Sequence, residues 1–288
     1  MIKDIYEEIV ALRSKGIPAA LATIIRRKGA TPRKDSAKML IYADRSQLGT
    51  IGGGSIDADV CREAQLIMES GIPKLIAVNL KVADFEERTV ICGGIMEIYI
   101  EPILPDPTLF IFGAGHVSKA LAAAVKLIGI KVAIIDDQPK YANRERFPDA
   151  DAFYIDGWEE SLKKISANKW SYFFIATRSH EFDLVCLRFA LQSPARYIGM
   201  LGSRDKAAAL FEKLEKEGLN PSEFERVVVP AGLDIGSESP EEIAASIAAE
   251  IIAVRKNLDV RALKDAVNHA RHRGASAVPE SGARDESV

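Results

Sequence analysis

The sequence is poor in cysteine, with three in 288 residues, and its positive and negative charges nearly cancel. The cysteines, at positions 61, 92 and 186, form no CxxC pair, which excludes a disulfide framework and a zinc ribbon. Lysine and arginine number 38 against 41 acidic residues, so the chain has no overall basic field to attract nucleic acid. We therefore expect free thiols and no nucleic-acid partner.

Long hydrophobic runs are absent as well. No apolar run approaches the length that spans a bilayer. The opening segment, MIKDIYEEIVALRSKG, carries acidic residues and lacks the apolar core of a signal peptide. With 48% hydrophobic and 27% charged residues, the composition is instead that of an ordinary globular protein. We expect a cytoplasmic protein without membrane contact.

Proline gathers at one place, where Pro102, Pro105 and Pro107 fall within six positions. Because proline fixes φ and removes a backbone donor, this segment suits an extended linker. At roughly 150 residues per domain, the chain length also favours two domains. The sequence predicts an N-terminal α+β domain at residues 1–103, a nucleotide-binding domain at 104–259, and a helical or disordered tail at 260–288.

Short β-rich segments alternate with helical patterns after the proline-rich segment. This alternation predicts an α/β fold with a Rossmann-like parallel sheet. The six strands are expected at residues 108–112, 131–136, 152–155, 171–176, 196–201 and 226–229. The last long helix should have Ser239 as its N-cap and Pro240 as its first residue, with Glu242 completing a capping box, and should end near Asn257.

The smaller N-terminal domain should combine an opening amphipathic helix with a short sheet. Its strands are expected at residues 18–27, 38–43, 74–80 and 94–101, with a helix at 56–70. Cys61, Ala64 and Met68 share one face of that helix, so the thiol of Cys61 should be buried.

A glycine turn follows the first predicted strand of the C-terminal domain. Gly113 and Gly115 leave backbone N–H groups open to a phosphate at the helix start, and His116 stands beside them. Asp136 ends the next strand, where dinucleotide-binding folds bind a ribose hydroxyl. Ser118 replaces the third glycine of the strict pattern. The alternative is a tight strand-to-helix connection without a ligand.

Polar loops follow two further strands and should meet the glycine turn at the carboxyl edge of a parallel sheet. The loops supply Thr177, His180 and Asp183 after one strand, and Ser203, Arg204 and Lys206 after the next. Together these side chains predict a second anion-binding wall. The alternative for each residue is ordinary chemistry at a helix start, because serine and threonine cap helices and acids suit their first turn.

The N-terminal domain carries another candidate anion site. Residues 26–38 hold six basic residues, Arg33 among them, and one acid. Gly52, Gly53 and Gly54 then lead into a helix, so backbone N–H groups and the helix dipole can face a phosphate. A hairpin or bulge that needs positive φ is the alternative for these glycines, and Asp57 can instead stabilise the helix start.

Cys92 differs from the other two cysteines. It precedes Gly93 and Gly94 at the mouth of a strand, where a thiol can be exposed and backbone donors can stabilise a thiolate. The alternative is a core cysteine at a strand end. Cys186 lies on the apolar face of a predicted helix and should be buried.

Taken together, these motifs resemble the XdhC/CoxI family of xanthine dehydrogenase accessory proteins. KGATPRKDSAKMLIYADRSQLGTIGGGSIDADV and CGGIMEIYIEP are similar to its N-terminal domain. FIFGAGHVSKALA, TRSHEFD, YIGMLGSRDK and PAGLDIGSESPEEIAASIAAEI are similar to its Rossmann domain. The combination, in this order, covers nearly the whole chain and is more specific than any single motif.

The resemblance implies a chaperone rather than an enzyme with turnover of its own. Such a protein binds molybdenum cofactor, as molybdopterin or its dinucleotide form, and protects it during sulfuration by a cysteine desulfurase. It then delivers the cofactor to an apo-molybdenum hydroxylase of the xanthine dehydrogenase type. A homodimer would fit an accessory protein of this size.

The resemblance also implies roles for individual residues. Cys92 would lie near the molybdenum as a metal contact. The pterin phosphate would meet Arg33 and the glycines 52–54, and a nucleotide portion would meet Gly113, Gly115 and His116.

Two other functions would use the same residues. An NAD(P)-dependent oxidoreductase would bind ribose through Asp136 and use His180 as acid or base. A nucleotide-sensing scaffold would instead let ligand binding regulate assembly with a partner enzyme. Binding experiments separate both from cofactor delivery.

Overall fold

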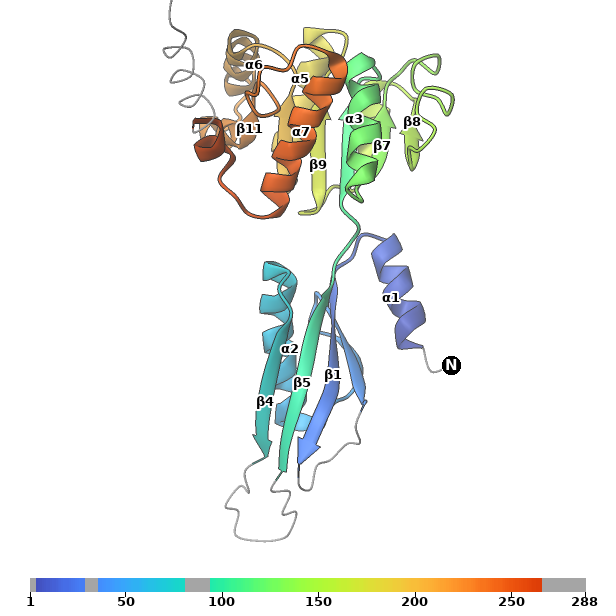
Figure 1. Ribbon diagram of the computed structural model, residues 1–288, viewed down its shortest axis with the longest axis vertical. Helices are drawn as coiled ribbons and strands as arrows, with labels where there is room; N and C mark the ends of the chain where they lie inside the picture. The colour runs from blue at the N-terminus through green and yellow to red at the C-terminus, as the bar shows by residue number, and fades with distance from the viewer. Residues whose placement is uncertain (1–3, 29–35, 81–93, 266–288) are drawn as a thin grey trace, which may run out of the picture. The chain divides into compact units, whose positions relative to one another are not determined.

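The computed structural model describes residues 4–28, 36–80 and 94–265. The chain divides into two compact units, Met1–Asp106 and Pro107–Val288, and each has its own sheet and hydrophobic core (Figure 1). The division falls inside the proline-rich segment. The predicted combination of a Rossmann-like α/β unit with a smaller α+β unit is confirmed.

The N-terminal unit is built on a five-stranded antiparallel sheet. Its strands, in spatial order, are β3 (Gln47–Gly49), β2 (Lys38–Tyr42), β1 (Ala19–Lys28), β5 (Gly94–Ile103) and β4 (Lys74–Leu80). Helices α1 (Ile5–Ser14) and α2 (Gly54–Ser70) pack on it. Helix α2 begins two residues before the predicted start, and the three residues of β3 are too few to show a period in the sequence.

Side chains of this sheet alternate between two clusters. Ala22 and Ile24 of β1 pack with Val60 of α2. Ala19 is an odd-numbered residue of β1, whereas Ala22 and Ile24 are even-numbered, and it packs with Leu12 of α1. Since successive strand residues face opposite sides, the two helices lie on opposite faces of the sheet.

The C-terminal unit holds a six-stranded parallel sheet in the order β11-β10-β9-β6-β7-β8. The strands are β6 (Thr108–Phe112), β7 (Lys131–Ile135), β8 (Ala152–Tyr154), β9 (Ser171–Ile175), β10 (Tyr197–Met200) and β11 (Val227–Val228). The order runs outward from β6 in both directions. The topological switch point therefore lies between β6 and β9, as in a Rossmann domain.

Helices cover both faces of this sheet. They are α3 (His116–Leu127), α4 (Trp158–Lys163), α5 (His180–Leu191), α6 (Arg204–Lys216) and α7 (Pro240–Arg255). Helices α3 and α7 pack on one face, with Ile111 of β6, and α4, α5 and α6 pack on the other, with Phe112 (Figure 1). Because both faces are buried, the strands appear in the sequence as continuous apolar segments.

The predicted elements of this unit form with small shifts. All six strands lie within one residue of their expected ends, and the capping box of Ser239 and Glu242 is confirmed. Helix α7 ends at Arg255, before the expected Asn257, and a 3-10 helix at Pro221–Arg226 was not predicted. Residues 260–265 are helical, and the rest of the predicted tail lies outside the described residues.

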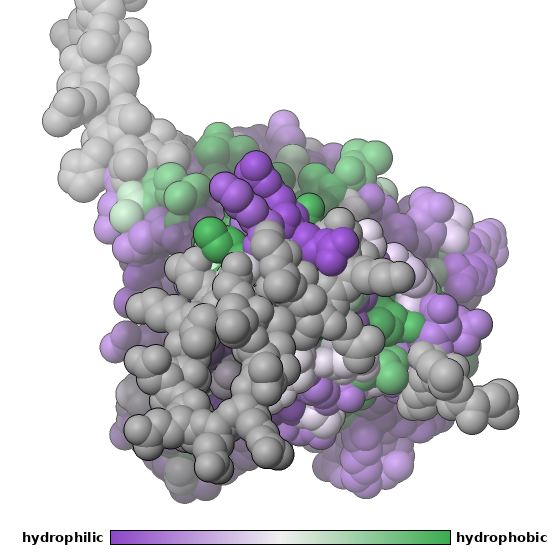
Figure 2. All heavy atoms as spheres, turned by 90° about the horizontal axis from the view of Figure 1, so that it is seen from below, coloured by the Kyte–Doolittle hydropathy of each residue, from purple (hydrophilic) through white to green (hydrophobic). Residues whose placement is uncertain are grey.

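In the part of the chain that the structure describes, no helix combines the length and the apolar character needed to cross a bilayer. The face drawn in Figure 2 carries hydrophilic side chains interleaved with smaller hydrophobic areas.

Candidate functional site

Half of the predicted site residues lie at the carboxyl edge of the parallel sheet. Gly113, Gly115 and His116 follow β6, Asp136 follows β7, His180 follows β9, and Ser203 and Arg204 follow β10. Open α/β sheets bind ligands at this edge, near the switch point. The structure therefore brings these seven residues to the edge at which a nucleotide would bind.

The turn after β6 is fixed by its neighbours. Gly113 has a φ of +99°, and its N–H donates to the carbonyl of Ile135 at 2.8 Å. A Cβ there would collide with the carbonyl oxygen of Ala176 and lie 2.7 Å from its carbonyl carbon. The next N–H, of Ala114, donates to Asp136 Oδ2 at 2.9 Å. Glycine is therefore required at position 113 by the fold itself.

Gly115 is different, because it forms the open start of α3. It is the N-cap residue, and no side chain caps this helix, whereas Ser179, Ser203 and Ser239 cap α5, α6 and α7. A Cβ on Gly115 would have no atom of the described residues within 4 Å. The first N–H groups of a helix have no intrahelical acceptor and carry the positive end of its dipole. This start therefore has the donors and the space that an anion needs.

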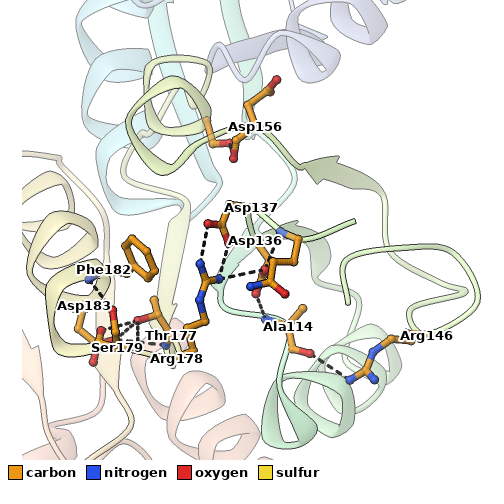
Figure 3. A network of polar contacts seen from close by, with 12 residues as sticks. Ala114, Asp136, Asp137, Arg146, Asp156, Thr177, Arg178, Ser179, Phe182 and Asp183 are labelled. Atoms are coloured by element: carbon orange, nitrogen blue, oxygen red, sulfur yellow. Dashed lines mark hydrogen bonds and ion pairs between the residues drawn. The ribbon is translucent and has the colours of Figure 1, made fainter. Parts of the chain in front are cut away.

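Two aspartates follow β7, and both lie near Arg178, but only Asp137 is hydrogen-bonded to it, whereas Asp136 Oδ1 lies 3.8 Å from its Nη1 (Figure 3). Asp136 is 6% exposed, and besides Ala114 it accepts the N–H of Gln138 at 2.9 Å through Oδ1. Asp137 is more exposed and forms a two-bond ion pair with Arg178, in which Nη2 donates to Oδ2 at 2.7 Å. The hydrogen bond from Arg178 is the main cause that lowers the pKa of Asp137.

The Arg178–Asp137 pair links two loops across a strand that lies between them. Arg178 follows β9 and Asp137 follows β7, while β6 separates these strands in the sheet. The guanidinium also lies 4.5 Å from the centre of the Phe182 ring. The pair was not predicted, because its partners are 41 residues apart and only the strand order brings them together. It supplies a cation and a carboxylate beside the glycine turn.

Several side chains of the predicted second anion-binding wall already contact one another. Asp183 is fully buried, accepts Thr177 Oγ1 at 2.7 Å, and lies 2.5 Å from Lys206 Nζ. Ser203 Oγ accepts the N–H of Lys206, as a helix cap does. For Thr177, Asp183 and Ser203 the structure therefore favours helix-start chemistry, the alternative interpretation, and the Lys206 side chain is engaged in an ion pair with Asp183.

His180 and Arg204 keep exposed positions at the same edge. They are the first residues of α5 and α6. Arg204 forms no ion pair or side-chain hydrogen bond with any residue that the structure describes, so its guanidinium is available to an anion.

In the N-terminal unit the carboxylate of Asp57 accepts hydrogen bonds from the backbone of the glycine loop. Asp57 Oδ1 accepts the N–H groups of Ile51, Gly52 and Gly53 at 3.0 to 3.1 Å, and Oδ2 accepts Thr50 Oγ1 at 2.7 Å. Asp57 is 7% exposed. A phosphate at Gly52 and Gly53 would have to displace this carboxylate, so the structure favours the alternative in which Asp57 holds the helix start.

Burial alone would raise the pKa of Asp57, but hydrogen bonds from Thr50, Gly52, Gly53 and Gln47 outweigh it and lower the pKa. Gly54 is exposed at the first position of α2 and lines a pocket of about 540 Å³ that also contains Arg45 and Arg62. Arg33 lies outside the described residues.

Two of the three thiols are buried, as predicted. Burial and the nearby Asp183 raise the pKa of Cys186 well above its ordinary value, and burial and Asp57 raise that of Cys61. Cys92 and Gly93 lie outside the described residues, and Gly94 is the first residue of β5, paired with Leu80. In residues 4–28, 36–80 and 94–265, no three histidine, cysteine or acidic side chains form a metal-binding group.

Iodoacetamide should therefore leave Cys61 and Cys186 of the folded protein unmodified, because the thiolate is the reacting form and both pKa values are raised. Mass spectrometry of tryptic peptides after brief labelling measures this, and unfolding in guanidinium chloride should release both sites as the control. Rapid labelling of Cys186 before unfolding would contradict its burial.

Comparison with known proteins gives two family matches. The profile described as XdhC Rossmann domain matches residues 109–251, and the profile described as XdhC and CoxI family matches residues 12–79. The first contains the Gly113 turn and the Arg178–Asp137 pair. The second contains the glycine loop and Asp57.

Individual proteins are similar over long segments. The chain is 31% identical over 255 residues to the uncharacterized protein YqeB of Escherichia coli (strain K12), which covers 88% of this chain and 47% of that protein. It is 34% identical over 163 residues to a probable xanthine dehydrogenase subunit of Bacillus subtilis (strain 168), covering 57% of this chain and 47% of that one. The chain thus spans about half the length of these relatives.

A solved structure is also similar. It is the crystal structure of a xanthine dehydrogenase from Bacillus halodurans, with 22% identity and a TM-score of 0.49. The match covers 88% of this chain and 96% of that one.

Proposed function

Because the chain belongs to the XdhC and CoxI family, we propose that it acts in the maturation of an enzyme of the xanthine dehydrogenase type. It binds molybdenum cofactor as cargo, protects it during sulfuration by a cysteine desulfurase, and delivers it to an apo-molybdenum hydroxylase in the cytoplasm. It acts as a chaperone without turnover. The name of the Bacillus subtilis relative supports the choice of client.

The open start of α3 is the observation that carries this proposal. Molybdopterin carries a phosphate, and its dinucleotide form carries a pyrophosphate and a ribose. Gly115 leaves room for a phosphate to reach uncapped N–H groups, and Arg178 supplies a cation at the same edge. An anion cradle with a cation beside it suits this cargo.

Asp137 suits the ribose hydroxyls better than Asp136 does. Both oxygens of Asp136 already accept backbone N–H groups that hold the glycine turn in place. Asp137 is the more exposed of the two, and its partner Arg178 can exchange that carboxylate for a ligand phosphate. Ligand binding would then open the ion pair and leave Asp137 free to accept ribose hydroxyls.

Retention of molybdenum tests the function directly. The full chain is incubated anaerobically with molybdenum cofactor, passed through gel filtration, and assayed for metal by mass spectrometry. We expect stoichiometric metal on the wild-type chain and a large loss in Cys92→Ser, because in this proposal Cys92 contacts the molybdenum.

Cys61→Ser and Cys186→Ser are the matched controls, since both thiols are buried. An equal loss in all three variants would remove the assigned role of Cys92. A different result would favour an NAD(P)-dependent oxidoreductase. In that case the wild-type protein would retain no metal but would bind NAD(P) and turn over a hydroxylated substrate.

A further inference from the structure

A cavity of about 810 Å³ opens at the carboxyl edge of the C-terminal sheet, beside β10 and β11. Its walls come from the loops after these strands, the first two turns of α7, and the helical segment 260–265. Small-molecule sites commonly measure roughly 300–1,000 Å³. No residue of the Gly113 turn lines this cavity, whereas Ser203 and Arg204, which follow β10 at the same edge, do line it. The cavity is therefore a second site beside the turn.

The cavity has an apolar lining and two polar groups that have no partner in the described part of the chain. Leu201, Leu233 and Ile243 contribute to the apolar part. Ser237 Oγ is buried and has no hydrogen-bond partner among the described residues. Arg204 at the rim is likewise unpaired within the described part of the chain. A buried hydroxyl without a partner is costly, so a ligand atom that bonds to it would be stabilising.

A third polar residue of the wall, Lys264, is already engaged. Its Nζ donates to the carbonyl of Pro230 at 2.7 Å and lies 2.8 Å from Glu250 Oε2. Glu250 is fully buried and also accepts Tyr197 Oη at 2.6 Å and the N–H of Gly232 at 3.1 Å. Lys264 therefore stabilises the wall, whereas Ser237 and Arg204 remain available to a ligand.

The cavity lies within reach of the Gly113 turn. In the sheet order, β10 is two strand spacings from β6, and β11 is three. At about 4.8 Å per spacing, the two sites are on the order of 10 to 14 Å apart along the edge. A mononucleotide bound at the turn would not fill both sites, but a ligand of two parts joined by a pyrophosphate would.

We propose that this cavity binds the ring end of an extended anionic ligand whose nucleotide end lies at the Gly113 turn. Arg204 pairs with an anionic oxygen of the ligand, and Ser237 Oγ forms a hydrogen bond with a ring heteroatom. The inference rests on the nucleotide site of the proposed function and adds a second site in the same unit.

The test compares a two-part probe with its nucleotide half, on the full chain and on the double variant Ser237→Ala with Arg204→Ala. The probes are the cytosine dinucleotide form of molybdopterin and CDP, measured by calorimetry under anaerobic conditions. The wild-type chain should bind the dinucleotide about 100-fold more tightly than CDP, and the double variant should lower that ratio to below about tenfold. CDP affinity should stay within about twofold, because Arg204 follows β10, two strand spacings from β6, and CDP bound at the Gly113 turn does not extend that far.

Stability separates a lost ligand contact from a lost fold. The double variant should melt at the wild-type temperature, because neither side chain has a partner to lose within residues 4–28, 36–80 and 94–265. Lys264→Ala is the structural control and should melt lower, because it leaves buried Glu250 without its cation.

Three outcomes overturn the inference. If CDP and the dinucleotide bind the wild-type chain equally, or if the double variant changes neither affinity, the cavity is not a ligand site and the proposed nucleotide site stands. If the wild-type chain binds neither probe, the nucleotide site of the proposed function fails and the cavity inference fails with it.

Discussion

Gly115→Ala should weaken nucleotide binding by about 100-fold while leaving the C-terminal unit as stable as the wild type. A fall of that size corresponds to about two charge-assisted hydrogen bonds of ~1.4 kcal/mol each. A Cβ at this position meets no atom of residues 4–28, 36–80 or 94–265 within 4 Å, and the φ of −75° is open to alanine. The methyl group would instead occupy the space through which a phosphate approaches the N–H groups of α3.

Gly113→Ala is the matched variant, and it should act through the fold. The added Cβ would collide with the carbonyl of Ala176, and the φ of +99° is unfavourable for alanine. We expect a loss of at least ~2 kcal/mol in the free energy of unfolding. Guanidinium denaturation measures the stability of both variants, and calorimetry with CDP measures their affinity.

Comparison of the two glycine variants separates an effect on ligand binding from an effect on the fold. Wild-type affinity in Gly115→Ala would show that the open start of α3 does not hold a phosphate, and the proposed cargo site would move elsewhere. A Gly115→Ala chain that is both destabilised and weak in binding would mean that glycine is needed there for the fold.

The sequence predicts well which residues lie at the carboxyl edge of the parallel sheet, because this depends on local patterns along the chain. Six apolar segments with intervening helical patterns fix a parallel sheet, and a parallel sheet brings the loops after its strands to one edge. These patterns alone predict that Gly113, Asp136 and His180 lie at this edge. Serine caps at helix starts are equally visible in the sequence, because the serine and the backbone N–H that donates to its hydroxyl are three residues apart.

Contacts between distant segments could not be predicted in this way. The partner of Arg178 depends on which strands are neighbours, and two acidic residues, Asp136 and Asp137, compete for it on equal terms in the sequence. The sequence also does not show in which direction a backbone N–H group points, and therefore which acceptor it meets. Gly52 and Gly53 suggest an anion site, and the anion they meet is Asp57, four residues beyond the second of them. The acid close to the glycine cluster is the signal behind the alternative interpretation, in which Asp57 stabilises the helix start, and the structure favours that alternative.

Asp57→Ala should destabilise the N-terminal unit by about 3 kcal/mol. The variant leaves the N–H groups of Ile51, Gly52 and Gly53 without their acceptor, and such groups are costly when buried. Asp59→Ala is the matched control on the same helix. The Asp59 side chain is 55% exposed and pairs with Arg62, so its loss should cost less than about 1 kcal/mol. Equal effects of the two variants in urea denaturation would contradict the role assigned to the Asp57 carboxylate.

Acidification should remove the contribution of the Asp57 carboxylate to the free energy of unfolding. The folded state lowers the pKa of this carboxyl, since its hydrogen bonds outweigh the desolvation that would raise it. Its contribution to stability is therefore complete above the unfolded pKa of about 3.9 and is lost as the pH falls through the lower folded pKa. The difference in unfolding free energy between wild type and Asp57→Asn should stay constant from about pH 7 to pH 5 and shrink below about pH 4. A difference that grew on acidification would mean that the folded state favours the protonated acid, and the glycine loop would then be free to accept a phosphate.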